Sequence, residues 1–119
     1  MENNFKEGGS MKTLNLKIEV EDVFKDTKEK PNITETFTNV ILNSMLQFSQ
    51  QKRGFTKKER IQYYRISKEF DKAVKESKES IEIDDELFGF IRKCFNDGSF
   101  TPNTLLERVE KNIDEVQYR

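Results

Sequence analysis

The chain has 119 residues, of which 34% are hydrophobic and 36% charged, and its net charge at pH 7 is −1. This length suits one domain with a single core, and ten phenylalanines that recur among aliphatic residues argue against disorder. The balanced net charge excludes a protein-wide field that would steer a polyanion. Because no stretch approaches the apolar length of a membrane span, neither a transmembrane helix nor a membrane partner is expected.

Charge is distributed unevenly along the chain. Residues 31–80 carry ten Lys or Arg and six Asp or Glu, whereas residues 81–119 carry five and nine. The middle of the chain is therefore basic and its C-terminal third is acidic. Such asymmetry can orient a nucleic acid or a head-to-tail association between copies, although it also arises by chance.

The N-terminal segment is expected to lie outside the domain. Gly8, Gly9 and Ser10 form a linker-like trio. Residues 1–12 are accordingly predicted to form a flexible arm, and residues 13–119 a single domain. The start of the chain also lacks the apolar core of a signal peptide.

The first predicted element is a β-strand over residues 13–20. Apolar and polar residues alternate there, which indicates a strand with one buried face. The residues of that face are Leu14, Leu16, Ile18 and Val20. Since a single strand is not stable alone, we expect it to pair with residues 23–24, with residues 81–83, or with a second copy of the protein.

The most apolar predicted helix spans residues 33–50. Asn32 is its expected N-cap, and Glu35 is placed to complete a capping box. Its apolar residues recur at helical spacing and cover an unusually wide face. Such a helix is either the central helix of the domain or half of an oligomer interface. The second alternative defines the candidate protein-interface residues Phe37, Ile41, Leu42, Met45 and Leu46.

Three further helices are predicted. Thr56 and Glu59 form a capping box for a helix that runs to about residue 75, with Tyr63 on its inner face. A third helix follows the N-cap Asp84, and Thr101-Pro102 is expected to start the last one. The predicted fold class is α+β and mostly helical, with an N-terminal β-strand, in a hairpin or small sheet, followed by four α-helices.

Side chains suited to catalysis are scarce. The sequence has no histidine and a single cysteine, which removes the usual general base and a structural zinc site. Cys94 falls on the apolar stripe of the third helix and is expected to be a buried thiol. The acidic residues 82–86 suit a calcium or magnesium ion, but helix capping is the favoured interpretation. We expect no enzyme, no metal site and no cofactor.

The segment Q-Q-K-R-G-F-T-K-K-E-R at residues 50–60 is strongly basic. Cations beside aromatic residues suit phosphates and stacked bases, and Phe55, Tyr63 and Tyr64 lie within or just after it. The candidate nucleic-acid residues are Lys52, Arg53, Lys57, Lys58 and Arg60. We favour a solvated helix face instead, on which the cations form salt bridges with acidic residues such as Glu69 and Glu76.

The order of elements resembles that of small tailed-phage and prophage proteins without an assigned activity. The resemblance covers roughly residues 13–116 and rests on four stretches: F-T-N-V-I-L-N-S-M-L, T-K-K-E-R-I-Q-Y-Y-R-I-S-K-E-F, I-E-I-D-D-E-L-F-G-F-I-R-K-C-F and S-F-T-P-N-T-L-L-E-R-V-E. It implies a non-enzymatic role in the host cytoplasm or in the virion. It transfers no functional residue to this chain.

The leading hypothesis is a protein that acts by binding a viral or host protein, or its own copies as a homo-oligomer. One alternative is a nucleic-acid-binding accessory protein that uses residues 52–60. Another is an anti-defence inhibitor or a small-molecule sponge. Under the leading hypothesis, Leu46→Lys converts an oligomer to a monomer, whereas unfolding of this variant would assign Leu46 to the core.

Overall fold

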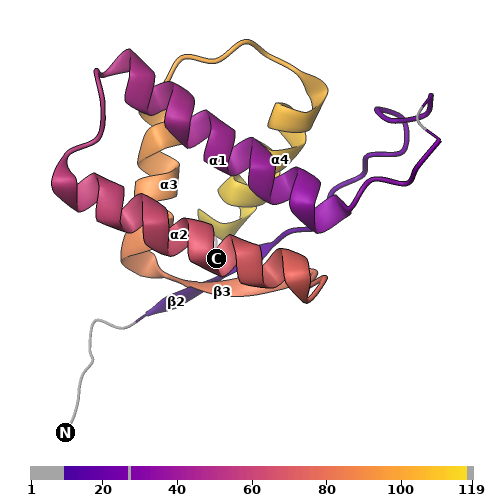
Figure 1. Cartoon of the computed structure of the whole chain (residues 1–119), viewed down its shortest axis with the longest axis horizontal. Helices are drawn as coiled ribbons and strands as arrows, with labels where there is room; N and C mark the ends of the chain where they lie inside the picture. The colour runs from indigo at the N-terminus through magenta and orange to yellow at the C-terminus, as the bar shows by residue number, and fades with distance from the viewer. Residues whose placement is uncertain (1–9, 27, 118–119) are drawn as a thin grey trace, which may run out of the picture.

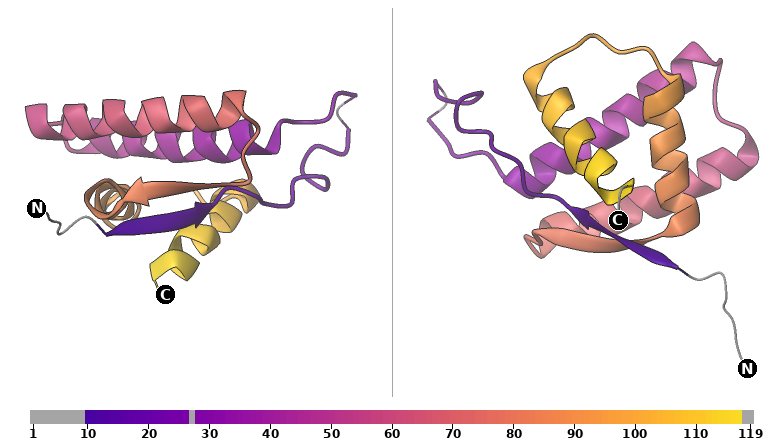
Figure 2. Two further views of the ribbon diagram at one scale, coloured as in Figure 1. Left: turned by 90° about the horizontal axis from the view of Figure 1, so that it is seen from below. Right: turned by 180° about the vertical axis from the view of Figure 1, so that it is seen from behind.

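Within residues 10–26 and 28–117, which the computed structural model describes, two short strands and four helices form two layers (Figure 1). In chain order the elements are β2 (Met11–Asn15), α1 (Ile33–Gln51), α2 (Lys57–Lys75), β3 (Ser80–Asp84), α3 (Asp85–Asp97) and α4 (Thr104–Gln117). Helices α1 and α2 lie side by side in one layer, with the strands, α3 and α4 beneath them (Figure 2). The predicted α+β, mostly helical fold class is confirmed.

The two strands form an antiparallel sheet in which Leu14 lies opposite Ile81. Of the three pairing partners considered for the first strand, residues 81–83 are therefore the correct one. The predicted arm extends too far, because Met11 and Lys12 already belong to β2. The rest of that predicted arm, residues 1–9, lies outside the described residues.

The predicted strand over 13–20 is wrong in its boundaries, since β2 ends at Asn15. The alternating burial nevertheless continues to Val20. Helix α4 takes the place of a neighbouring strand: the Asn112 side-chain amide donates to the carbonyl oxygens of Asn15 and Lys17 at 2.9 and 3.2 Å. Period-2 burial thus predicted the faces of this segment, but not the nature of its hydrogen-bond partner.

Helix α1 is the central helix of the domain. Asn32 Oδ1 accepts the Glu35 backbone N–H at 2.9 Å, which confirms the N-cap. The reciprocal bond of the predicted capping box is absent between these two described residues. The inner face of α1 packs against α2, α3 and α4, and Phe37, Ile41 and Met45 have no exposed surface.

In α2, the capping box formed by Thr56 and Glu59 is confirmed. The inner face is formed by Ile66, Phe70 and Ala73, which are buried. The predicted inner-face residue Tyr63 is only half-buried, whereas Gln62 is buried. Burial of Gln62 is tolerated since its side-chain amide donates to Glu86 Oε1 at 3.1 Å.

The last helix begins later than Thr101-Pro102 predicted. Helix α4 starts at Thr104, and Asn103 Oδ1 accepts the Leu106 N–H at 2.8 Å, as an N-cap does. Residues 98–103 consequently form a longer connection across the end of α3. This connection helps to build the groove described below.

Candidate interaction surfaces

Lys52 is part of the fold rather than of an open basic patch. Its Nζ lies 2.7 and 2.8 Å from the two carboxylate oxygens of Glu59, which also accepts the Thr56 N–H at 2.8 Å. Burial alone would raise the pKa of Glu59, but the hydrogen bonds from Lys52 and Thr56 outweigh it and hold that pKa below its ordinary value. The pair joins the end of α1 to the start of α2.

The other members of the basic segment do not converge on one site either. Arg60 Nη1 donates to the Phe55 carbonyl oxygen at 2.9 Å, and Arg53 adopts a positive φ of 70° in the turn after α1. Phe55 itself packs against Phe90, with ring centroids 5.4 Å apart, so this ring is not free to stack on a base. All five candidate nucleic-acid residues are exposed, but Lys52 and Arg60 are bonded within the fold.

An outward-facing stripe on α2 combines apolar and cationic side chains. Ile61 is 50% exposed and Tyr64 is 60% exposed, although both are large and partly apolar. Helical spacing places cations on the same face. We call this set the α2 outer face: Lys57, Ile61, Tyr64, Arg65 and Lys68.

The cations of the α2 outer face have no carboxylate within 4.0 Å among residues 10–26 and 28–117. The predicted salt bridges with Glu69 and Glu76 do not form, and Glu76 lies instead 3.3 Å from Lys78. The helix face is exposed to solvent as expected, and Lys52 and Lys78 do pair with Glu59 and Glu76. The expected salt bridges are wrong only for the cations of the α2 outer face, within the described residues. The cations surround exposed apolar surface without partners of their own in this part of the chain.

The candidate protein-interface residues on α1 separate into two groups. Phe37, Ile41 and Met45 are fully buried in the monomer, so they are unavailable to a partner. Leu42 is half-buried and Leu46 is 42% exposed, on the border of the same helix. The wide apolar stripe thus reports mostly the packing of a central helix, and only its margin reaches the surface.

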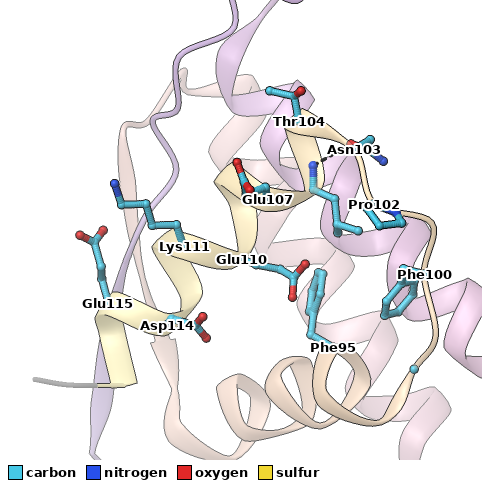
Figure 3. Close-up of a pocket in the computed structure, with 12 residues that line it drawn as sticks. Phe95, Phe100, Pro102, Asn103, Thr104, Glu107, Glu110, Lys111, Asp114 and Glu115 are labelled. Carbon is cyan, nitrogen blue, oxygen red and sulfur yellow. Dashed lines mark hydrogen bonds between the residues drawn. The ribbon is translucent and has the colours of Figure 1, made fainter.

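A second surface, which the sequence did not single out, lies along α4 (Figure 3). It is an open groove of about 900 Å³ between α4, the end of α3 and the connection between them. Phe95 and Phe100 form an aromatic wall, with ring centroids 5.9 Å apart. The acidic residues that line the groove are Glu107, Glu110, Asp114 and Glu115, and we call the whole surface the α4 groove.

Gly98 is necessary for this aromatic wall. A Cβ atom there would lie 2.5 Å from the Phe100 ring and 2.7 Å from the Cys94 carbonyl oxygen, which is closer than real Cβ contacts come. The glycine is thus required by close approach rather than by a left-handed backbone conformation, since its φ is −81°.

The α4 groove carries net negative charge, because four carboxylates line it beside one cation, Lys111. Partial burial, and secondarily the neighbouring Asp114 carboxylate, raise the pKa of Glu110. Within the described ranges, no Lys or Arg nitrogen lies within 4.0 Å of the four groove carboxylates. The acidic composition of the C-terminal third was the available signal, but it did not show which carboxylates share a surface with aromatic rings.

The residues weighed for chemistry have structural roles. Asp84 accepts the Glu86 N–H at 2.7 Å as the cap of α3, and Lys12 lies 3.7 Å from Asp85. No group of three or more His, Cys, Asp or Glu side chains in the described part of the chain is placed to hold a metal ion. Burial raises the pKa of the Cys94 thiol to about 12, which keeps it in the unreactive protonated form.

Comparison with known proteins gives no relative for this chain. No protein-family model matches it, and neither the curated proteins nor the solved structures contain a match. None of the described helices is both long enough and apolar enough to cross a membrane.

Proposed function

We propose that this protein is a non-enzymatic protein that works by binding another protein through the α2 outer face. The observation that carries the proposal is the exposure of Ile61 and Tyr64, 50% and 60%, among cations without salt-bridge partners in the described structure. Burying such an apolar side chain in an interface contributes about 1.5–3 kcal/mol. Aromatic residues and arginine are also enriched in interface centres, where they dominate binding energy.

A further exposed apolar residue lies on the neighbouring helix. Leu46, 42% exposed, belongs to α1, which lies beside α2 in the same layer (Figure 2). The lack of histidine in the sequence supports a non-enzymatic role. The setting we propose is the one that the phage resemblance implies, in the host cytoplasm or in the virion.

A photo-crosslinker at position 64 tests this proposal. In Tyr64→benzoylphenylalanine the new side chain keeps an aromatic ring at the exposed position, so the surface is minimally disturbed. We expect irradiation in producing cells to give a discrete covalent adduct with a protein, identified by mass spectrometry. The matched control is Glu82→benzoylphenylalanine, at an exposed position of β3. Equal adducts from both positions, or none from position 64, would contradict the proposal.

The same face supports a second candidate function, binding of single-stranded nucleic acid. An exposed aromatic ring between cations is what base stacking and phosphate contact require, and Tyr64 with Arg65 and Lys68 provides it. Fluorescence anisotropy of labelled oligonucleotides at two salt concentrations tests it, because the logarithm of affinity falls with log[salt] by about 0.7 per phosphate contact for single strands. Binding with that slope that is weakened by Tyr64→Ala would favour nucleic acid, whereas flat titrations would exclude it.

A further inference from the structure

Helices α2 and α4, which carry the α2 outer face and one wall of the α4 groove, lie on opposite sides of the molecule. In one view of Figure 2 α2 is in the upper layer and α4 projects below, and in the other view α4 is in front with α2 behind it. The cations of one copy therefore do not reach the groove carboxylates of that same copy. The α2 outer face thus combines positive charge with apolar side chains, and the α4 groove combines net negative charge with aromatic rings.

We propose that the α2 outer face of one copy docks into the α4 groove of a second copy. This inference rests on the proposed function and names the partner as the protein itself. The two surfaces are complementary both in charge and in their apolar side chains. Among the described residues, Arg65 and Lys68 have no carboxylate within 4.0 Å, and the groove carboxylates have no Lys or Arg nitrogen within 4.0 Å. Lys111 also lines the groove, so its charge is four carboxylates against one cation.

The apolar parts of the two surfaces match as well. Tyr64 and Ile61 project among cations, whereas Phe95 and Phe100 line a groove that is rimmed by carboxylates. An edge or offset contact between Tyr64 and these rings is the favourable arrangement of aromatic pairs. A cation held at the same time near Glu110 relieves the like-charge repulsion between Glu110 and Asp114.

Two different surfaces that meet in this way form a heterologous contact. Each bound copy leaves one α2 outer face and one α4 groove unoccupied, so association either closes into a ring or continues as an open chain. Opposite charges at an exposed rim are screened by salt, with a Debye length of about 8 Å at 0.15 M and about 3 Å at 1 M. Association is thus expected to rise with protein concentration and to fall with added salt.

Sedimentation velocity of the full chain and of two variants tests the docking. The face variant, Ile61→Ser with Tyr64→Ser, retains an intact groove. The groove variant, Glu110→Gln with Asp114→Asn and Glu115→Gln, retains an intact α2 outer face. We expect the wild type to associate at low salt and each variant alone to remain monomeric. An equimolar mixture of the two variants is expected to form a heterodimer and nothing larger, because only one complementary pair of surfaces remains.

Mixing the two variants distinguishes the contact between face and groove from other modes of self-association. A symmetric contact of α2 with α2 would leave the groove variant associated and would not be restored by mixing. A wild type that stays monomeric at low salt and at the highest attainable concentration would overturn the docking. If position 64 then crosslinked to a different protein, the proposed function would stand without the self-association. Absence of any adduct at position 64 would contradict both the self-association and the proposed function.

Folding controls keep the result interpretable. Far-UV circular dichroism and thermal unfolding of each variant should match the wild type, because the altered side chains lie at the surface. If the face variant were unstable, Arg65→Gln with Lys68→Gln removes the charges alone, and it should weaken association without unfolding. As a matched control, Lys25→Gln with Glu29→Gln alters exposed charges in the loop before α1 and should associate like the wild type.

Discussion

Replacing Glu59 by glutamine tests whether the basic segment serves the fold. The substitution keeps the shape of the side chain but removes the charge that binds Lys52 and the Thr56 N–H. Loss of a capping interaction costs about 1 kcal/mol, and a hydrogen bond to a charged group contributes about 1.5–3 kcal/mol. Because the Lys52 side chain is 31% exposed, part of this is offset by solvent. We expect Glu59→Gln to lower the free energy of unfolding by about 2–3 kcal/mol.

Urea unfolding followed by circular dichroism measures this loss directly. One kcal/mol shifts the melting temperature by about 4–8 °C in a domain somewhat smaller than this one, so the thermal midpoint should fall by roughly 10 °C. The matched control is Glu69→Gln on the same helix, whose exposed carboxylate has no cation within 4.0 Å among the described residues. That variant should stay within about 0.5 kcal/mol of the wild type.

The dependence on pH gives an independent readout. The folded pKa of Glu59 lies below its ordinary value of 4.5, so the ionised side chain contributes stability that is fully present above that value. This stability is lost as the pH falls through the folded pKa. The difference between wild type and Glu59→Gln should accordingly shrink as the pH is lowered below 4.5. Equal stability of the Glu59 and Glu69 variants at neutral pH would refute the structural role of the pair.

Four other variants or reactions follow from burial and close contact. Ile41→Ala should cost about 2–5 kcal/mol in urea unfolding, because Ile41 is fully buried, and a loss of under 1 kcal/mol would contradict its place in the core. In contrast, Leu46→Lys should leave the unfolding free energy within about 0.5 kcal/mol, since the side chain is 42% exposed, and unfolding of this variant would assign Leu46 to the core after all. Gly98→Ala should cost about 1–3 kcal/mol through overlap with the Phe100 ring, and a neutral result would show that the ring moves freely. Cys94 should react with iodoacetamide only as the protein unfolds, because burial raises its pKa to about 12, and rapid alkylation of the native protein would contradict this.

Local signals explain the successful part of the sequence-based prediction. An N-cap such as Asn32 or a capping box such as Thr56 with Glu59 needs only neighbouring residues, so its chemistry is visible in the sequence. Period-2 burial over residues 14–20 was predicted correctly for the same reason. What the pattern did not contain was the identity of the neighbour. Asn112 of α4, far away in the sequence, satisfies the carbonyl groups that a further strand would otherwise bind.

The candidate sites were less predictable because they depend on what lies across space. Five apolar residues of α1 satisfied the same pattern, yet only the margin at Leu42 and Leu46 reaches solvent. Likewise the sequence shows Lys52 as one cation among several, although the fold places it against Glu59.

The sequence by itself determined the order of the helices, the N-caps of α1, α2 and α3, the buried thiol and the division into a basic middle and an acidic end, because each depends on composition or on residues a few positions apart. Tertiary structure alone decided which apolar residues of α1 are core, which cations lack a partner in the described structure, and which carboxylates gather beside Phe95 and Phe100. The physical reason is that exposure and charge pairing are properties of surfaces, and a surface is assembled from segments that are distant along the chain.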